Sequence, residues 1–195
     1  MVRMRIVAGL ALTALGCRSP RVLVAPMVDL APHTRIGIVT FTAQGASGTL
    51  SAFATQRFSE QLLRAQPGTE ILELGAVAGP IDAAMARKLG EQHKVKTVIV
   101  GLLTVSDVKP KISILGGLSA SAEATVSLAT KLLSTESGGT LWAQSTRVRE
   151  TLAAVSLVNG EAVFGSKDPQ DAYGDVVNAM VWTLTQDFRS TYVKQ

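Results

Sequence analysis

One cysteine stands where the chain would be processed and modified. Cys17 is the single cysteine of the 195 residues, and it follows a basic start with Arg3 and Arg5 and an apolar run from Ile6 to Leu15. Basic, apolar and small residues in that order are typical of a secretory signal peptide. We therefore predict that residues 1–16 are removed and that Cys17 begins the mature chain. With one cysteine, the chain cannot form an internal disulfide.

The residues that lead to this cysteine resemble the lipobox of bacterial lipoproteins. They read Thr13-Ala14-Leu15-Gly16-Cys17, with Ala14 where a bulkier aliphatic residue is more usual. The resemblance implies that the sulfur of Cys17 receives diacylglycerol, and that acyl chains such as palmitate anchor the protein. It also implies the outer membrane, since Arg18 replaces the aspartate that favours retention in the inner membrane. The alternatives are an uncleaved anchor and an unrelated buried cysteine.

Charge and histidine content argue against two other classes of function. The formal net charge is +4 at pH 7, and removal of Arg3 and Arg5 would leave +2. A nucleic-acid partner needs a clustered basic face, and the sequence shows none. His33 and His93 are isolated, and the zinc motif His-Glu-x-x-His does not occur. We therefore predict neither a nucleic-acid partner nor a metal site.

The motifs of hydrolases and of nucleotide-binding enzymes are incomplete. The run Gly117-Leu118-Ser119-Ala120-Ser121 lacks the second glycine of a nucleophile elbow. The loop Gly45-Ala46-Ser47-Gly48 lies between a predicted strand and a predicted helix, where phosphate-binding loops occur, but it lacks their Lys-Ser/Thr pair and spaced glycines. We expect this loop to be a flexible connection, and we predict no enzyme activity and no cofactor.

Two further groups of residues have structural explanations. Asp168 and Asp171 could act as paired carboxylates, but they stand where the start of a helix favours an N-cap and first-turn acids. Trp142, Trp182 and Tyr192 could line a ligand groove, although aromatic residues at strand and helix spacing more often belong to the core. A role in binding or assembly is the hypothesis that remains.

The mature chain divides into a short tether and one domain. Residues 17–34 contain Pro20, Pro26 and Pro32 and could span at most ~60 Å. Several apolar residues in this tether indicate that part of it packs on the domain. Residues 35–195 have the length of a single domain, here assigned to the periplasm.

The pattern of apolar residues predicts eight main elements. The predicted strands are 35–41, 70–74, 95–105, 122–132 and 140–151, and the predicted helices are 50–65, 81–93 and one that starts at Asp168-Pro169. The last helix carries an apolar stripe of Tyr173, Val176, Val177, Met180, Val181, Leu184, Phe188 and Tyr192. A turn at Glu136-Ser137-Gly138-Gly139 joins the last two strands. The order β-α-β-α-β-β-β-α predicts an α/β fold with a mixed, mostly antiparallel sheet flanked by helices.

With this order the chain resembles the curli-secretion (CsgG-like) superfamily of envelope lipoproteins. That superfamily includes penicillin-binding-protein activators and an exopolysaccharide-export ring lipoprotein. The matching features are the lipidated cysteine, the opening strand RIGIVTF, the strand KTVIVGLLTV and the hairpin ATVSLATKLLSTESGGTLWAQSTRV. The resemblance implies a partner protein in the envelope and a homo-oligomeric ring as one form of assembly.

Two segments occupy the places where the secretion channel of this superfamily inserts hairpins into the outer membrane. They are residues 107–121 and residues 152–167, the second with the turn signal Asn159-Gly160. A membrane-spanning strand needs about 9 to 11 residues. Charged residues and a proline at 109–111 and the run 166–168 interrupt the arms. The alternative is that both are exposed hairpins that contact subunits or partners.

These observations predict a non-enzymatic lipoprotein that acts in envelope assembly or export through protein–protein contacts. One alternative is a subunit of a ring-forming, curli-type secretion channel. Another is an activator of a penicillin-binding protein, although such activators typically carry a long disordered linker. The short tether, 17–34, instead favours a domain that lies close to its membrane.

Overall fold

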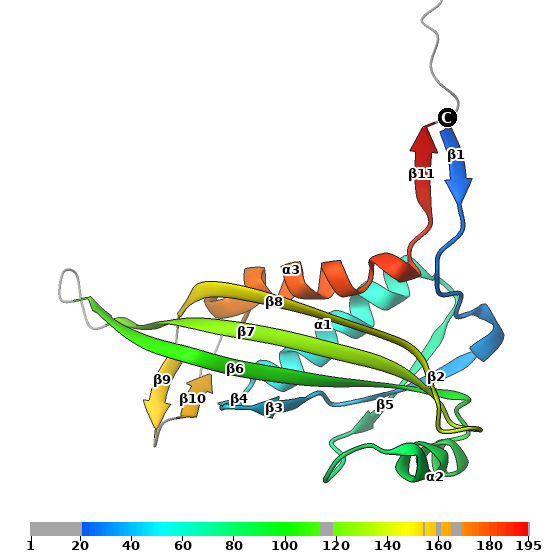
Figure 1. Cartoon of the computed structure of the whole chain (residues 1–195), viewed down its shortest axis with the longest axis horizontal. Coiled ribbons are helices and arrows are strands. Elements are labelled where there is room, and N and C mark those ends of the chain that lie inside the picture. The colour runs from blue at the N-terminus through cyan, green and yellow to red at the C-terminus, as the bar shows by residue number, and fades with distance from the viewer. Residues whose placement is uncertain (1–20, 114–118, 154, 159–160, 165–168, 195) are drawn as a thin grey trace, which may run out of the picture.

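The computed structural model describes residues 21–113, 119–153, 155–158, 161–164 and 169–194 (Figure 1). Cys17, the signal segment, the Asn159-Gly160 turn and Asp168 lie outside this range. The described chain forms one mixed α/β domain whose main elements follow the predicted order. Within the described ranges, no helix is long and apolar enough to cross a membrane.

A six-stranded sheet forms the centre of the domain. Its main strands lie in the order β5 (Glu70–Gly75), β2 (Arg35–Val39), β6 (Thr97–Ser113), β7 (Ser119–Ser134) and β8 (Thr140–Ala153), and β3 (Thr42–Gln44) also pairs with β6. β2 runs parallel to β5 and β6, whereas β6, β7 and β8 form a long antiparallel ribbon. The predicted mixed and mostly antiparallel sheet is therefore confirmed.

Within the described residues, three α-helices flank this sheet. α1 (Leu50–Ala65) and α3 (Asp175–Leu184) cover one face, and α2 (Ala83–His93) lies at the end near β5 (Figure 1). α1 has the predicted bounds, because its apolar residues recur every three or four positions until Pro67-Gly68. α2 begins two residues later than predicted, where the side chain of Asp82 accepts a 2.8 Å hydrogen bond from the backbone N–H of Met85.

The main core lies between the sheet and the pair α1 and α3. β7 places alternate residues there: Ala122, Ala124, Val126, Leu128 and Leu132. A smaller cluster under α2 contains Val39, Leu89, Val95 and Val98. Alternation along β7 therefore fixes which face of the sheet the helices cover.

The prediction of a flexible loop at Gly45–Gly48 is wrong. Ala46–Gly48 forms strand β4, which pairs in parallel with β10 (Glu161–Phe164), and β10 pairs with β9 (Val155–Val158). Gly45 and Gly48 have φ values of +73° and +93°. A Cβ added at Gly48 would collide with the carbonyl oxygen of Phe164, so the close pairing itself requires glycine.

The structure bears on both predicted hairpins. In the first, residues 109–113 and 119–123 pair antiparallel and continue β6 and β7 beyond a bulge between Ser106 and Lys109, while residues 114–118 lie outside the described range. In the second segment, β9 and β10 do form an antiparallel hairpin, yet Ala162 and Phe164 of β10 are fully buried in the main core. The interpretation of this segment as an exposed hairpin is therefore wrong for the β10 arm.

The C-terminal region differs from the single long helix that was predicted. It begins with a one-turn π-helix, Gln170–Gly174, which we call the π-turn, continues as α3 and ends at Leu184. The hydroxyl of Thr185 donates to the carbonyl of Val181. A 3-10 turn, Gln186–Phe188, then leads into β11 (Thr191–Lys194). Tyr192 thus belongs to a strand, and its place on the helical stripe was wrong.

Candidate functional site

Both ends of the described chain meet in a two-stranded ribbon that projects from the body of the domain (Figure 1). β1 (Arg21–Val24) pairs antiparallel with β11, so that Arg21 lies opposite Lys194 and Val24 lies opposite Thr191. Cys17 precedes Arg21 by four residues, a distance that an extended chain covers in at most ~14 Å. The predicted lipid anchor is therefore joined to the free end of this ribbon. We call β1 and β11 together the terminal ribbon.

Apolar side chains of the terminal ribbon are open to solvent. The exposed members are Val22, Leu23, Val24, Tyr192 and Val193, with exposed fractions between 42% and 68%. In a paired strand, successive residues point to opposite faces. Val22 and Val193 consequently share one face, and Leu23 and Tyr192 share the other. Neither face is packed against the body of the domain.

The base of the terminal ribbon is fastened by one glutamine at the end of α1. The side-chain oxygen of Gln66 accepts a 2.7 Å hydrogen bond from the backbone N–H of Leu30. Its amide nitrogen donates to the carbonyl oxygens of Val28, at 2.5 Å, and Phe188, at 3.1 Å. Leu30 itself is fully buried in the main core. Part of the predicted tether therefore packs on the domain, as its apolar residues indicated.

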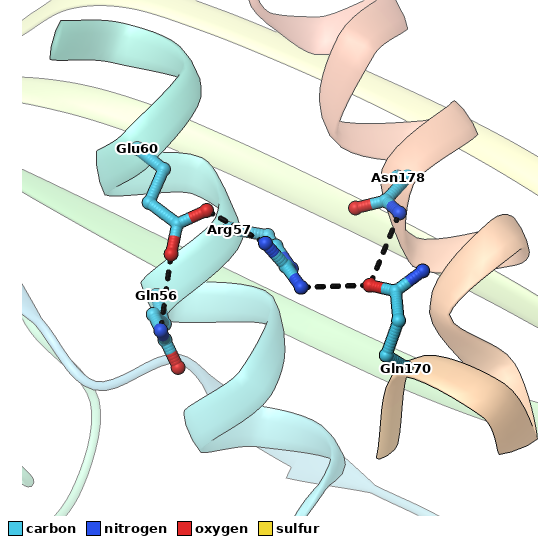
Figure 2. Close-up of polar contacts among 5 residues, drawn as sticks. All are labelled: Gln56, Arg57, Glu60, Gln170 and Asn178. Atoms are coloured by element: carbon cyan, nitrogen blue, oxygen red, sulfur yellow. Dashed lines mark hydrogen bonds and ion pairs between the residues drawn. The ribbon is translucent and has the colours of Figure 1, made fainter. Parts of the chain in front are cut away.

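A polar network links α1 to the π-turn before α3 (Figure 2). One guanidinium nitrogen of Arg57 donates to Gln170 at 2.7 Å, and another donates to Glu60 at 2.8 Å. Gln170 also accepts a 3.5 Å contact from Asn178, while Gln56 donates to Glu60 at 3.0 Å. These groups pair a cation with an anion and with amides, which positions the two helices relative to each other. The network contains no nucleophile next to a base.

A hollow of about 490 Å³ lies beside the π-turn and β8. Its lining includes the carboxylates Glu150, Asp171 and Asp175. Tyr173 also lines it, and burial raises the pKa of the Tyr173 hydroxyl above its ordinary value, an effect that the hydrogen bond with Thr49 partly opposes. Among the residues that the structure describes, no three His, Cys, Asp or Glu side chains converge to hold a metal ion.

A second hollow, of about 750 Å³, lies between α2, β6 and the turn after β7. Its lining includes His33, Arg87, Lys94 and Lys96, together with Glu91. Lys94 and Lys96 are exposed. His93 is half-buried at the end of α2 and does not line this hollow.

The three aromatic residues assigned to the core have different surroundings. Trp142 is buried, but Trp182 is 51% exposed and Tyr192 is 68% exposed, so the core assignment was wrong for these two. Trp182 is not one of the positions of the apolar stripe, which include Val181 and Leu184, and it lies on the outer side of α3. Helical spacing therefore already indicated that Trp182 is exposed. The guanidinium of Arg189 stacks over the Trp182 ring at 4.0 Å from its centroid and donates to Gln61 at 2.7 Å.

Comparison with known proteins gives a match in fold alone. The sequence matches no protein-family model, and no curated protein matches it. The fold is similar to that of the PelC dodecamer from Paraburkholderia phytofirmans, with a TM-score of 0.51, 13% identity, and coverage of 88% of this chain and 98% of PelC. A PelC L103M dodecamer gives the same TM-score with 12% identity. Lipoprotein GNA1162 from Neisseria meningitidis gives a TM-score of 0.41 over 60% of this chain, with 16% identity.

Proposed function

We propose that this protein is a non-enzymatic lipoprotein of the bacterial outer membrane that assembles with copies of itself and acts in envelope assembly or export. Lipid on Cys17 anchors it, and the α/β domain faces the periplasm. The observation that carries the proposal is the terminal ribbon, whose free end leads directly to Cys17 and projects away from the body (Figure 1). This arrangement delivers the modified cysteine to a membrane without disturbing the core.

The polar groups of the domain support a role in binding rather than catalysis. Arg57 is engaged by Glu60 and Gln170, and its contacts hold helices together. The hydroxyl of Tyr173 is shared with Thr49 at 2.5 Å. Both side chains therefore hold α1 against the segment before α3.

Assembly of identical copies has two lines of support. PelC, one structure with a similar fold, is a dodecamer. On this chain, exposed Trp182 is stacked under Arg189, and tryptophan and arginine are the side chains most enriched at the energetic centres of protein interfaces. We infer that the surface around Trp182, Arg189 and Gln61 contacts another copy, and we name it the Trp182 patch.

The anchor is tested by Cys17→Ser in the full chain. The unchanged protein should be processed after residue 16, should gain the mass of lipid and should sediment with outer membranes. The serine variant should accumulate unprocessed and without lipid. Normal processing and membrane binding of the variant would contradict the anchor.

Assembly is tested by the mass of the lipidated protein in mild detergent, measured by light scattering. A defined multiple of the subunit mass is the expected result, and a monomer at all concentrations would contradict the proposal. Ion conductance across planar bilayers would point to the channel alternative instead. Faster glycan polymerisation by a penicillin-binding protein, after addition of the monomer, would point to the activator alternative.

A further inference from the structure

The terminal ribbon has a surface that the body of the domain does not cover. Its two faces carry the exposed pairs Val22 with Val193 and Leu23 with Tyr192. A ribbon of two strands is marginally stable in water by itself, because it buries little apolar surface. Because apolar residues lie on both of its faces, the ribbon is stabilised by surroundings that cover both faces.

The chain beyond the ribbon indicates what this environment is. Arg21 stands four positions after Cys17, so the end of the ribbon lies within ~14 Å of the lipidated residue. The polar headgroup layer of a bilayer is about 5 to 8 Å thick on each side. A domain anchored through Cys17 thus holds the ribbon at the level of the lipid headgroups or directly beside them.

The charges at the Cys17 end of the terminal ribbon are complementary to lipid headgroups. The charged residues of segment 17–24 are Arg18 and Arg21, and Lys194 is the register partner of Arg21. The ribbon strands contain no Asp or Glu. Cations placed at the border of apolar side chains favour lipid phosphates, and basic residues beside apolar ones are typical of segments that lie in a membrane interface.

We propose that the terminal ribbon is a membrane-docking element that packs among the phosphate-bearing headgroups and upper acyl chains of the lipid surface beside the anchor. This inference rests on the proposed anchor at Cys17. Lipid molecules can pack around a narrow ribbon and cover both faces, whereas a protein partner with one flat surface covers one face. Docking at two points, the acyl chains and the ribbon, restricts how the domain is oriented toward the membrane.

The test uses a single fluorescent label in the lipidated full chain. Because the sulfur of Cys17 is consumed by lipid, Leu23→Cys supplies one free thiol for an environment-sensitive dye. Leu141→Cys on β8 is the matched control, since Leu141 and Leu23 are 52% and 55% exposed. Both proteins are placed on vesicles of phosphatidylethanolamine and phosphatidylglycerol, with and without brominated acyl chains. Thermal unfolding of each labelled protein checks that the fold is kept.

The expected result is a blue shift and quenching by brominated lipid at position 23, with neither at position 141. A dye at position 23 that stays in water while the protein floats with vesicles would overturn the docking proposal and leave the anchor intact. A blue shift without quenching by lipid would also overturn it, because protein would then cover the ribbon. If the unlabelled protein does not float and carries no lipid, the anchor fails, and the docking proposal fails with it.

Discussion

The indole Nε1 of Trp142 donates a 2.9 Å hydrogen bond to Oδ2 of Asp187. Trp142 belongs to β8, whereas Asp187 lies in the turn just before β11. The Trp142 ring also packs edge-on against Phe188, with 4.7 Å between the ring centroids. The main-chain oxygen of Asp187 accepts a 2.9 Å hydrogen bond from Val28. The sheet, the C-terminal turn and the N-terminal segment therefore meet at Asp187, which fastens the base of the terminal ribbon.

Asp187→Ala should destabilise the domain by about 1 to 3 kcal/mol, because it leaves the buried indole N–H of Trp142 without an acceptor. Urea unfolding followed by tryptophan fluorescence measures the change. Asp187→Asn keeps one oxygen acceptor and should lose less stability. Equal unfolding midpoints for both variants and the unchanged protein would contradict this role of Asp187.

Local patterns predicted the elements that local contacts define. α1 was placed with its observed bounds because Leu50, Phe53, Phe58 and Leu62 recur at helical spacing and all face the core. The strand predicted at 122–132 likewise lies within β7. The modified cysteine was predicted from neighbours in the sequence, and Cys17 lies outside the described residues, so this site stays a prediction.

The features that sequence analysis missed depend on residues far apart in the chain. β1 and β11 pair residues from near the two ends of the chain, such as Leu23 with Tyr192. The sequence of either four-residue strand does not indicate which segment it pairs with. β4 likewise forms because β10 lies beside it, more than 100 residues later. Tyr192 lies at helical spacing from the apolar stripe in the sequence, but α3 ends at Leu184 and a 3-10 turn leads into β11. The periodicity of apolar residues does not indicate which distant strands pair with each other.

Trp182→Ala should weaken self-assembly if the Trp182 patch lies between copies. Removal of a central interface tryptophan typically costs 2 kcal/mol or more of binding free energy, so we expect dissociation at about 30-fold higher protein concentration. Light scattering over a dilution series in mild detergent measures this. Leu141→Ala is the matched control, because Leu141 is equally exposed on β8. Unchanged assembly of Trp182→Ala would exclude the patch as an interface.

The contact between Arg57 and Gln170 should couple α1 to the π-turn. A double-mutant cycle with Arg57→Met and Gln170→Met should give a coupling energy of about 0.5 to 3 kcal/mol, since the 2.7 Å hydrogen bond is charge-assisted and partly buried. The pair Gln56 and Glu60, on the exposed side of α1, serves as the comparison. Its cycle should give about 0.2 to 0.5 kcal/mol. A larger value for the exposed pair would contradict the network drawn in Figure 2 as the link between the helices.

Tyr173 should make the stability of the domain depend on alkaline pH. Burial raises the pKa of its hydroxyl in the folded protein, so the neutral form contributes stability that is fully present below the unfolded pKa of about 10 and is lost as pH rises through the higher folded pKa. Tyr173→Phe should lower the free energy of unfolding by about 0.5 to 1.5 kcal/mol at pH 8, because the hydrogen bond to Thr49 disappears. Above pH 10, the free energy of unfolding of this variant should fall less steeply than that of the wild type. Urea unfolding from pH 8 to 11.5 measures both effects. Parallel curves for Tyr173→Phe and the wild type would refute the assignment.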